Sequence, residues 1–141
     1  MGMYTECYIN CKLIEDIPKE VLDILKYLFD NPFDEIEGKY KIDEPSTIPD
    51  HKLFNTDGWR LIGKGSSFYH IPFPTSKLSL EGRIPSSYYL TSRSDFKNYE
   101  GEIELFFDWI MPYVDNNDGE FIGYSRYEED DVPALKFEWR I

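Results

Sequence analysis

Basic residues are scarce in this sequence. The 141-residue chain has 15 lysines and arginines against 27 aspartates and glutamates, which gives a formal net charge of −12 at pH 7. A protein that binds nucleic acid without sequence preference needs lysine and arginine to displace the counterions of the phosphates, and an anionic membrane attracts the same two residues. The composition therefore argues against direct binding to nucleic acid or membrane, and it leaves a basic protein surface or a metal ion as compatible partners.

Cysteine and histidine are also scarce, with two of each. Cys7 and Cys11 fall on one side of a predicted strand, about 13 Å apart at about 3.3 Å per residue, which is too far for a disulfide. His51 and His70 are distant in sequence, and neither lies in a recognisable zinc or nucleophile motif. The sequence therefore predicts no catalytic residue, no metal site and no cofactor, and it favours a non-enzymatic protein.

Long apolar runs are missing as well. No segment approaches the roughly 20 apolar residues that a membrane-spanning helix needs, and the first residues lack the basic and then apolar pattern of a signal peptide. Together with the two cysteines, these absences predict a cytoplasmic protein. Hydrophobic residues still make up 41% of the chain and aromatic residues 17%, so the sequence predicts a single domain over residues 1–141 with its own core.

The hydrophobic periodicity predicts an α+β fold. Residues 3–14 alternate as a half-buried strand does, with the side of Cys7 facing inward. A helix is expected from about Pro18 to Phe29, and a second from about Asn98 to Pro112. The further predicted strands are 59–63, 67–71, 76–81, 87–95, 120–128 and 134–140. The order β-α-β-β-β-β-α-β-β predicts a mainly antiparallel sheet of about six to seven strands, with both helices packed on one face.

Residues 31–58 form a long irregular segment punctuated by proline and glycine. A loop of this length is unusual in a compact domain, which makes it a candidate functional loop. The other interpretation is a packed excursion held to the core by Ile48, Leu53 and Phe54. The sequence leaves both interpretations open.

The acidity is concentrated in residues 100–131, which hold eleven carboxylates and one basic residue, Arg126. Glu100, Glu104 and Asp108 are spaced by four, so a helix would align them along one face without interleaved bases. One interpretation is a docking surface for a basic partner, which imitates the phosphate row of a nucleic acid. The alternatives are a solvated helix face, or a face neutralised by the basic segment 59–97, whose net charge is +4.

Tyrosine beside these carboxylates strengthens the docking interpretation, because tyrosine gives contact area at low entropic cost. The predicted partner-binding residues are Glu100, Glu104, Asp108, Tyr127, Glu128, Glu129, Asp130 and Asp131.

Three motifs carry a resemblance to a known group of proteins. They are the predicted strand YLTSRS, the acidic segment DWIMPY and the later strand GYSRYEE, all within residues 85–135. In this order they resemble small acidic uncharacterised proteins of bacteria and their phages. The group has no established activity, so the resemblance implies no site residue. It does imply a prophage context, in which small acidic proteins often act as inhibitors or immunity proteins.

The sequence thus predicts a binding or inhibitor protein that engages a basic protein surface. The most specific version of this prediction is a phage-encoded nucleic-acid mimic. Two alternatives stay open: an immunity protein that neutralises a toxin, and a small ligand-binding or hydrolase domain that uses the 31–58 loop. The expected oligomeric state is a monomer or a homodimer.

Overall fold

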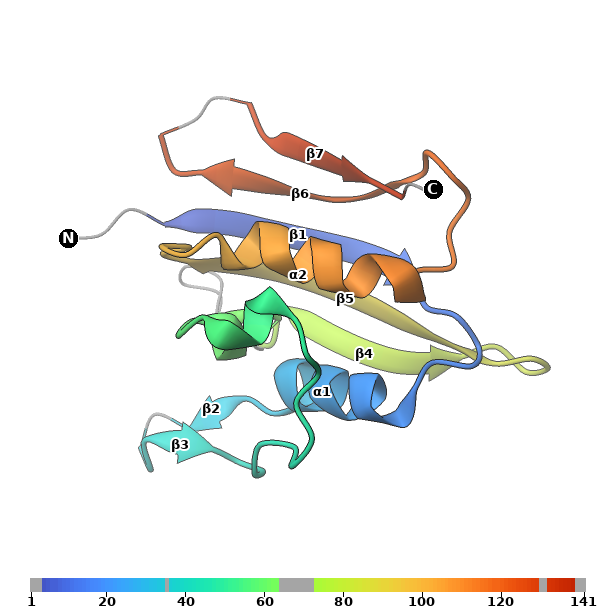
Figure 1. Cartoon of the computed structure of the whole chain (residues 1–141), viewed down its shortest axis with the longest axis horizontal. Helices are drawn as coiled ribbons and strands as arrows, with labels where there is room; N and C mark the ends of the chain where they lie inside the picture. Colours follow the sequence, from blue (N-terminus) through green and yellow to red (C-terminus); the bar gives the residue numbers. More distant parts are fainter. Residues whose placement is uncertain (1–3, 35, 64–72, 130–131, 139–141) are drawn as a thin grey trace.

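The computed structural model describes residues 4–34, 36–63, 73–129 and 132–138 (Figure 1). In this part of the chain a five-stranded antiparallel sheet has the strand order β4-β5-β1-β6-β7. The elements are β1 (Thr5–Lys12), α1 (Lys19–Asp30), β2 (Phe33–Asp34), β3 (Lys39–Tyr40), η1 (Lys52–Asn55), η2 (Trp59–Leu61), β4 (Ser76–Glu81), β5 (Ser87–Phe96), α2 (Glu102–Ile110), η3 (Met111–Tyr113), β6 (Phe121–Tyr127) and β7 (Ala134–Phe137). The predicted α+β fold is therefore confirmed.

Strand β1 lies at the centre of the sheet, between β5 and β6. Its alternating residues Cys7, Ile9 and Cys11 are almost fully buried, as the sequence pattern predicts. Thr5 pairs with Phe96 of β5 on one side and with Tyr127 of β6 on the other. The start of β1, the end of β5 and the end of β6 therefore lie at the same end of the sheet.

Both helices pack on the face of the sheet that carries Cys7 and Ile9 (Figure 1). Apolar residues of α1 and α2 recur at helical spacing and join one hydrophobic core with the inward side chains of the sheet. The rings of Phe29 on α1 and Phe106 on α2 lie 6.2 Å apart, so the two helices also contact each other. The predicted placement of both helices on one face is confirmed.

The predicted strand at 59–63 is wrong. Trp59 and Ile62 are buried while Leu61 is exposed, a spacing of three that suits the 3₁₀ helix η2 and not the alternation of a strand. The predicted strand at 67–71 lies outside the described residues. Segment 31–58 contains the short hairpin β2–β3 and the 3₁₀ helix η1, neither of which the sequence pattern predicts.

Helix α2 begins later than predicted. Asn98 has a positive φ of 52° and Gly101 one of 73°, so a tight turn precedes the first helical residue, Glu102. The Asn98 side chain still accepts a hydrogen bond from Ile103 N, so it caps the helix from outside it. Glu100 therefore lies in the turn, and of the three aligned carboxylates only Glu104 and Asp108 are on the helix. No helix in the described part of the chain is long and apolar enough to cross a bilayer.

Candidate partner-binding surface

The carboxylates of Glu100, Glu104 and Asp108 are exposed. The burial of α2 explains this, because its apolar residues and Glu102 turn toward the core and leave positions 104 and 108 on the outer side. The structure therefore places the predicted acidic row at the surface, with Glu100 contributed by the preceding turn.

Each of these carboxylates accepts a hydrogen bond from a neighbouring loop. Glu100 Oε2 accepts from Asp57 N at 2.7 Å, and Glu104 Oε2 accepts from Asn98 Nδ2 at 3.4 Å. Asp108 Oδ2 lies 2.8 Å from His51 Nε2. In the described structure none of the three forms an ion pair with lysine or arginine, although Lys97 lines clefts together with Glu100 and with Glu104.

His51 has a structural role that explains its contact with Asp108. Its Nδ1 accepts a hydrogen bond from Leu53 N at 3.0 Å and so caps η1. The neutral imidazole then carries its proton on Nε2, which donates to Asp108. Both ring nitrogens are occupied, so His51 is not placed to act as a general base.

The basic segment 59–97 does not neutralise the acidic row through its arginines. Arg60 pairs with Glu44, and Arg93 Nε lies 3.4 Å from Glu6 Oε2. Arg83 is exposed in the turn before β5, and the whole length of that strand separates it from Glu100. The alternative of internal neutralisation by these residues therefore loses its main support.

The turn after β6 brings further predicted residues to the same end of the sheet. Glu128 and Glu129 are exposed there, and Glu128 Oε2 accepts a hydrogen bond from Tyr4 N at 3.0 Å. Tyr127 is 38% exposed. Asp130 and Asp131 lie outside the described residues. We call the surface formed by Glu100, Glu104, Tyr127, Glu128 and Glu129 the acidic end; Asp108 lies one helical turn farther along α2.

Sequence reasoning missed an aromatic cleft beside the acidic end. The cleft has a volume of about 460 Å³, and its lining includes the partly exposed apolar residues Tyr4, Leu61 and Tyr99. We call it the Tyr99 cleft, since Tyr99 is 76% exposed. Tyr4 directly precedes β1, Leu61 belongs to η2, and Tyr99 lies in the turn before α2. They are distant in sequence, so only the fold brings them together around one cleft. The one local indication of this cleft in the sequence is that Tyr99 directly precedes Glu100.

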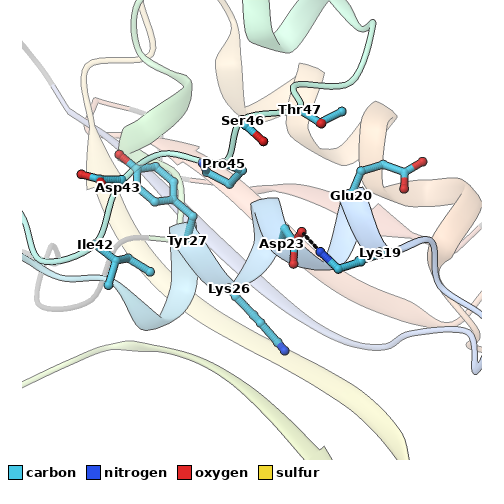
Figure 2. Close-up of a pocket in the computed structure, with 10 residues that line it drawn as sticks. All are labelled: Lys19, Glu20, Asp23, Lys26, Tyr27, Ile42, Asp43, Pro45, Ser46 and Thr47. Atoms are coloured by element: carbon cyan, nitrogen blue, oxygen red, sulfur yellow. Dashed lines mark hydrogen bonds and ion pairs between the residues drawn. The ribbon is translucent and has the colours of Figure 1, made fainter.

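Two other clefts border the 31–58 segment. Figure 2 shows the first, of about 460 Å³, between α1 and residues 42–47, with Lys19 and Asp23 joined at 2.9 Å on its α1 side. The second, of about 690 Å³, lies beside His51 and Asp108 and includes the buried Glu138. Segment 31–58 thus covers part of the core and also lines two clefts.

A separate polar cluster lies on the other face of the sheet. Glu6 of β1 is only 5% exposed and accepts hydrogen bonds from Tyr124 Oη and Arg93 Nε. The rings of Tyr8 and Tyr124 stack with centroids 5.4 Å apart. Burial, followed by the hydrogen bond to Glu6, raises the pKa of Tyr124 to about 12.

Comparison with models of known protein families, with curated proteins and with solved structures finds no match to this chain. The resemblance to small acidic proteins of bacteria and phages therefore stays a prediction. The fold and the surface define the chain as an α+β protein in which the exposed carboxylates Glu100, Glu104, Glu128 and Glu129 lie with aromatic residues at one end of an antiparallel sheet.

Proposed function

We propose that this protein is a non-enzymatic binding protein that holds a basic protein partner at the acidic end. One observation carries the proposal: Glu100, Glu104, Glu128 and Glu129 are exposed without a lysine or arginine ion pair in the described structure, while Arg60 and Arg93 pair elsewhere. Like charges held close together repel one another, so a basic partner relieves a cost that the isolated fold bears.

The neighbouring aromatic residues support a protein partner in particular. Tyrosine side chains contribute most to affinity when a partner covers them, and carboxylates around them set orientation and association rate. Tyr99 and Tyr127 lie beside the exposed glutamates in this way. Both free cysteines are buried, which agrees with a cytoplasmic setting for the encounter.

A charge-matched pair of variants tests the proposal. In the first, Glu100, Glu104, Glu128 and Glu129 are all replaced by Gln. In the second, four exposed carboxylates away from the acidic end are neutralised: Glu15→Gln, Asp16→Asn, Glu20→Gln and Glu81→Gln. Both lose the same charge, so a difference between them reports the position of the carboxylates.

Affinity capture from the native host, followed by binding measurements with the purified partner, gives the readout. The partner is expected to be basic, to lose at least tenfold in affinity with the first variant, and to dissociate as the salt concentration rises. The control variant is expected to stay within about threefold of the wild-type affinity. Equal binding by both variants would contradict the proposal.

The inhibitor and the immunity protein are two versions of this function and share the same physics. The predicted phage context favours an inhibitor of a host protein that handles nucleic acid, for which an acidic surface substitutes for phosphates. A toxin gene beside the gene for this protein would favour the immunity version.

A ligand-binding domain is the second candidate, and the clefts along residues 42–51 are the observation that favours it. A hydrolase at this position is less well supported, because both nitrogens of His51 already have partners. Screening metabolites by thermal shift tests this candidate, with a His51→Ala variant to locate any ligand at the larger cleft.

A further inference from the structure

We propose that the Tyr99 cleft binds an arginine side chain of the basic partner, with the buried carboxylate of Glu102 as its counter-ion. The inference rests on the proposed function, because the arginine belongs to that partner. It goes further by assigning one pocket, one buried charge and one kind of side chain.

Glu102 is an unusual residue in this cleft because it is charged, lines the cleft and is only 3% exposed. Its Oε1 accepts a hydrogen bond from Glu100 N at 3.0 Å. The carboxylate lies against Gly58, where an added Cβ would come within 3.2 Å of Glu102 Oε1. Gly58 therefore leaves the room that this carboxylate occupies.

The second oxygen of Glu102, Oε2, has no hydrogen-bond partner in the described structure, and Glu102 forms no ion pair there. Glu102 lines the cleft, and Oε2 is the carboxylate oxygen left for a ligand that enters it. Burying a carboxylate without a cation costs free energy, so a cation that enters the cleft gains a strong, charge-assisted hydrogen bond there.

The aromatic walls suit the same kind of ligand. Lys97 Nζ lies 5.7 Å from the centroid of the Tyr99 ring, which shows that this ring face accepts a cation. Tyr4 and Phe96 add further aromatic surface to the lining. An incoming cation can displace Lys97, which is exposed, from the ring without breaking an ion pair of the described chain.

Arginine fits this arrangement better than lysine. Asp57 and Glu100 are exposed residues of the cleft, and the bond from Asp57 N to Glu100 Oε2 holds them together. A guanidinium is planar and has five N–H donors, so it can stack on Tyr99 while it bonds to Glu102 and to a second carboxylate. An ammonium group is compact and can satisfy fewer of these contacts at once.

Titration of the whole protein with Nα-acetyl-arginine amide, followed by amide chemical shifts, tests the inference. Saturable shifts are expected at Leu61, Phe96 and Tyr99, with at least threefold weaker binding of Nα-acetyl-lysine amide. Nα-acetyl-citrulline amide, which has the shape of arginine without its charge, is expected not to saturate. Equal binding of the lysine or citrulline compound would overturn the inference.

Variants separate the buried carboxylate from the surrounding charge. Glu102→Gln keeps the Oε1 acceptor and is expected to weaken arginine-amide binding at least tenfold, whereas Glu81→Gln, at an exposed carboxylate away from the acidic end, stays within about twofold. If Glu102→Gln fails to fold, Tyr99→Ala is compared with Tyr89→Ala on the other sheet face, and only the first is expected to weaken binding. Equal effects within either pair would overturn the inference.

The two proposals can fail independently. Partner capture that depends on the acidic end, without saturable arginine-amide binding, contradicts the cleft alone. Arginine-amide binding that depends on Glu102, with a partner that ignores the acidic end, contradicts the proposed function alone.

Discussion

At the scale of single residues, Glu6 shows how this fold accommodates a charge in its interior. The alternation of β1 turns the Glu6 side chain away from the hydrophobic core, yet Glu6 is nearly as buried as its core-facing neighbours. Arg93 and Tyr124, from the two strands that flank β1, both bond to its carboxylate. A buried carboxylate that keeps a cation and a hydroxyl is stable, whereas one that loses a partner destabilises the fold.

Tyr124→Phe is expected to lower the free energy of unfolding by about 1.5 kcal/mol, since it removes a hydrogen bond to a charged and buried acceptor. Tyr8→Phe is the matched control. Tyr8 stacks on the same ring, and its hydroxyl has no partner in the described structure, so its loss is expected to cost less than about 0.5 kcal/mol. Urea unfolding of both variants gives the measurement, and equal losses would contradict the role of the Glu6 bond.

At the scale of elements, the turn before α2 shapes the acidic end. Asn98 and Gly101 both adopt positive φ, which brings Tyr99 and Glu100 to the surface before the helix begins. Asparagine tolerates this conformation better than most residues, and its side chain also reaches Ile103 N. The same residue thus starts the helix and positions the cleft.

Two substitutions at position 98 separate the side-chain hydrogen bonding of Asn98 from its backbone conformation. Asn98→Ala loses the hydrogen bond to Ile103 N and also strains the positive φ, so a loss of about 2 kcal/mol in unfolding free energy is expected. Asn98→Gly also loses the side-chain hydrogen bonds, including the long one to Glu104 Oε2, but adopts the positive φ without strain, and is expected to cost about 1 kcal/mol. Thermal or urea unfolding measures both. A glycine variant as unstable as the alanine variant would argue against strain at this position.

At the scale of the whole molecule, the fold determines which charged residues form ion pairs and which stay exposed. Arg60 and Arg93 of segment 59–97 pair with Glu44 and Glu6, while the carboxylates of the acidic end stay exposed. The core, in contrast, holds two free thiols that are sealed from water. Burial raises the pKa of both Cys7 and Cys11 to about 12.

These thiols make the stability of the whole protein sensitive to high pH. Above their ordinary pKa of 9.0 the unfolded chain loses the thiol protons, while the folded chain keeps them until its pKa of about 12. The unfolded state then binds fewer protons, so the free energy of unfolding is expected to fall as the pH rises from about 9 to 12.

Urea midpoints at pH 8 to 11 measure this decline. A Cys7→Ala/Cys11→Ala variant is expected to start from a lower stability, because it leaves cavities, and to decline less steeply with pH. Some decline should remain above pH 10, since the raised pKa of Tyr124 acts in the same direction. A variant with the wild-type slope would contradict the role of the thiols.

The sequence by itself determined the features that depend on neighbouring residues. Alternation predicted β1 with Cys7 inward and the strands at 76–81 and 87–95, and helical spacing with Pro32 predicted the extent of α1. Both signals repeat over a few residues, so they need no knowledge of distant contacts. The concentration of charge in residues 100–131 is likewise a property of the sequence alone.

The tertiary structure alone decided which residues meet. Trp59 begins the 3₁₀ helix η2 and Ile62 directly follows it, and both are buried three positions apart where the alternating pattern predicts a strand. Arg93 bonds to Glu6, which is 87 positions away in the sequence, and so this arginine lies away from the acidic row. Tyr4 and Tyr99 come together because β1 pairs with β5, and this pairing creates the cleft. Such contacts follow from long-range packing, which local periodicity does not encode.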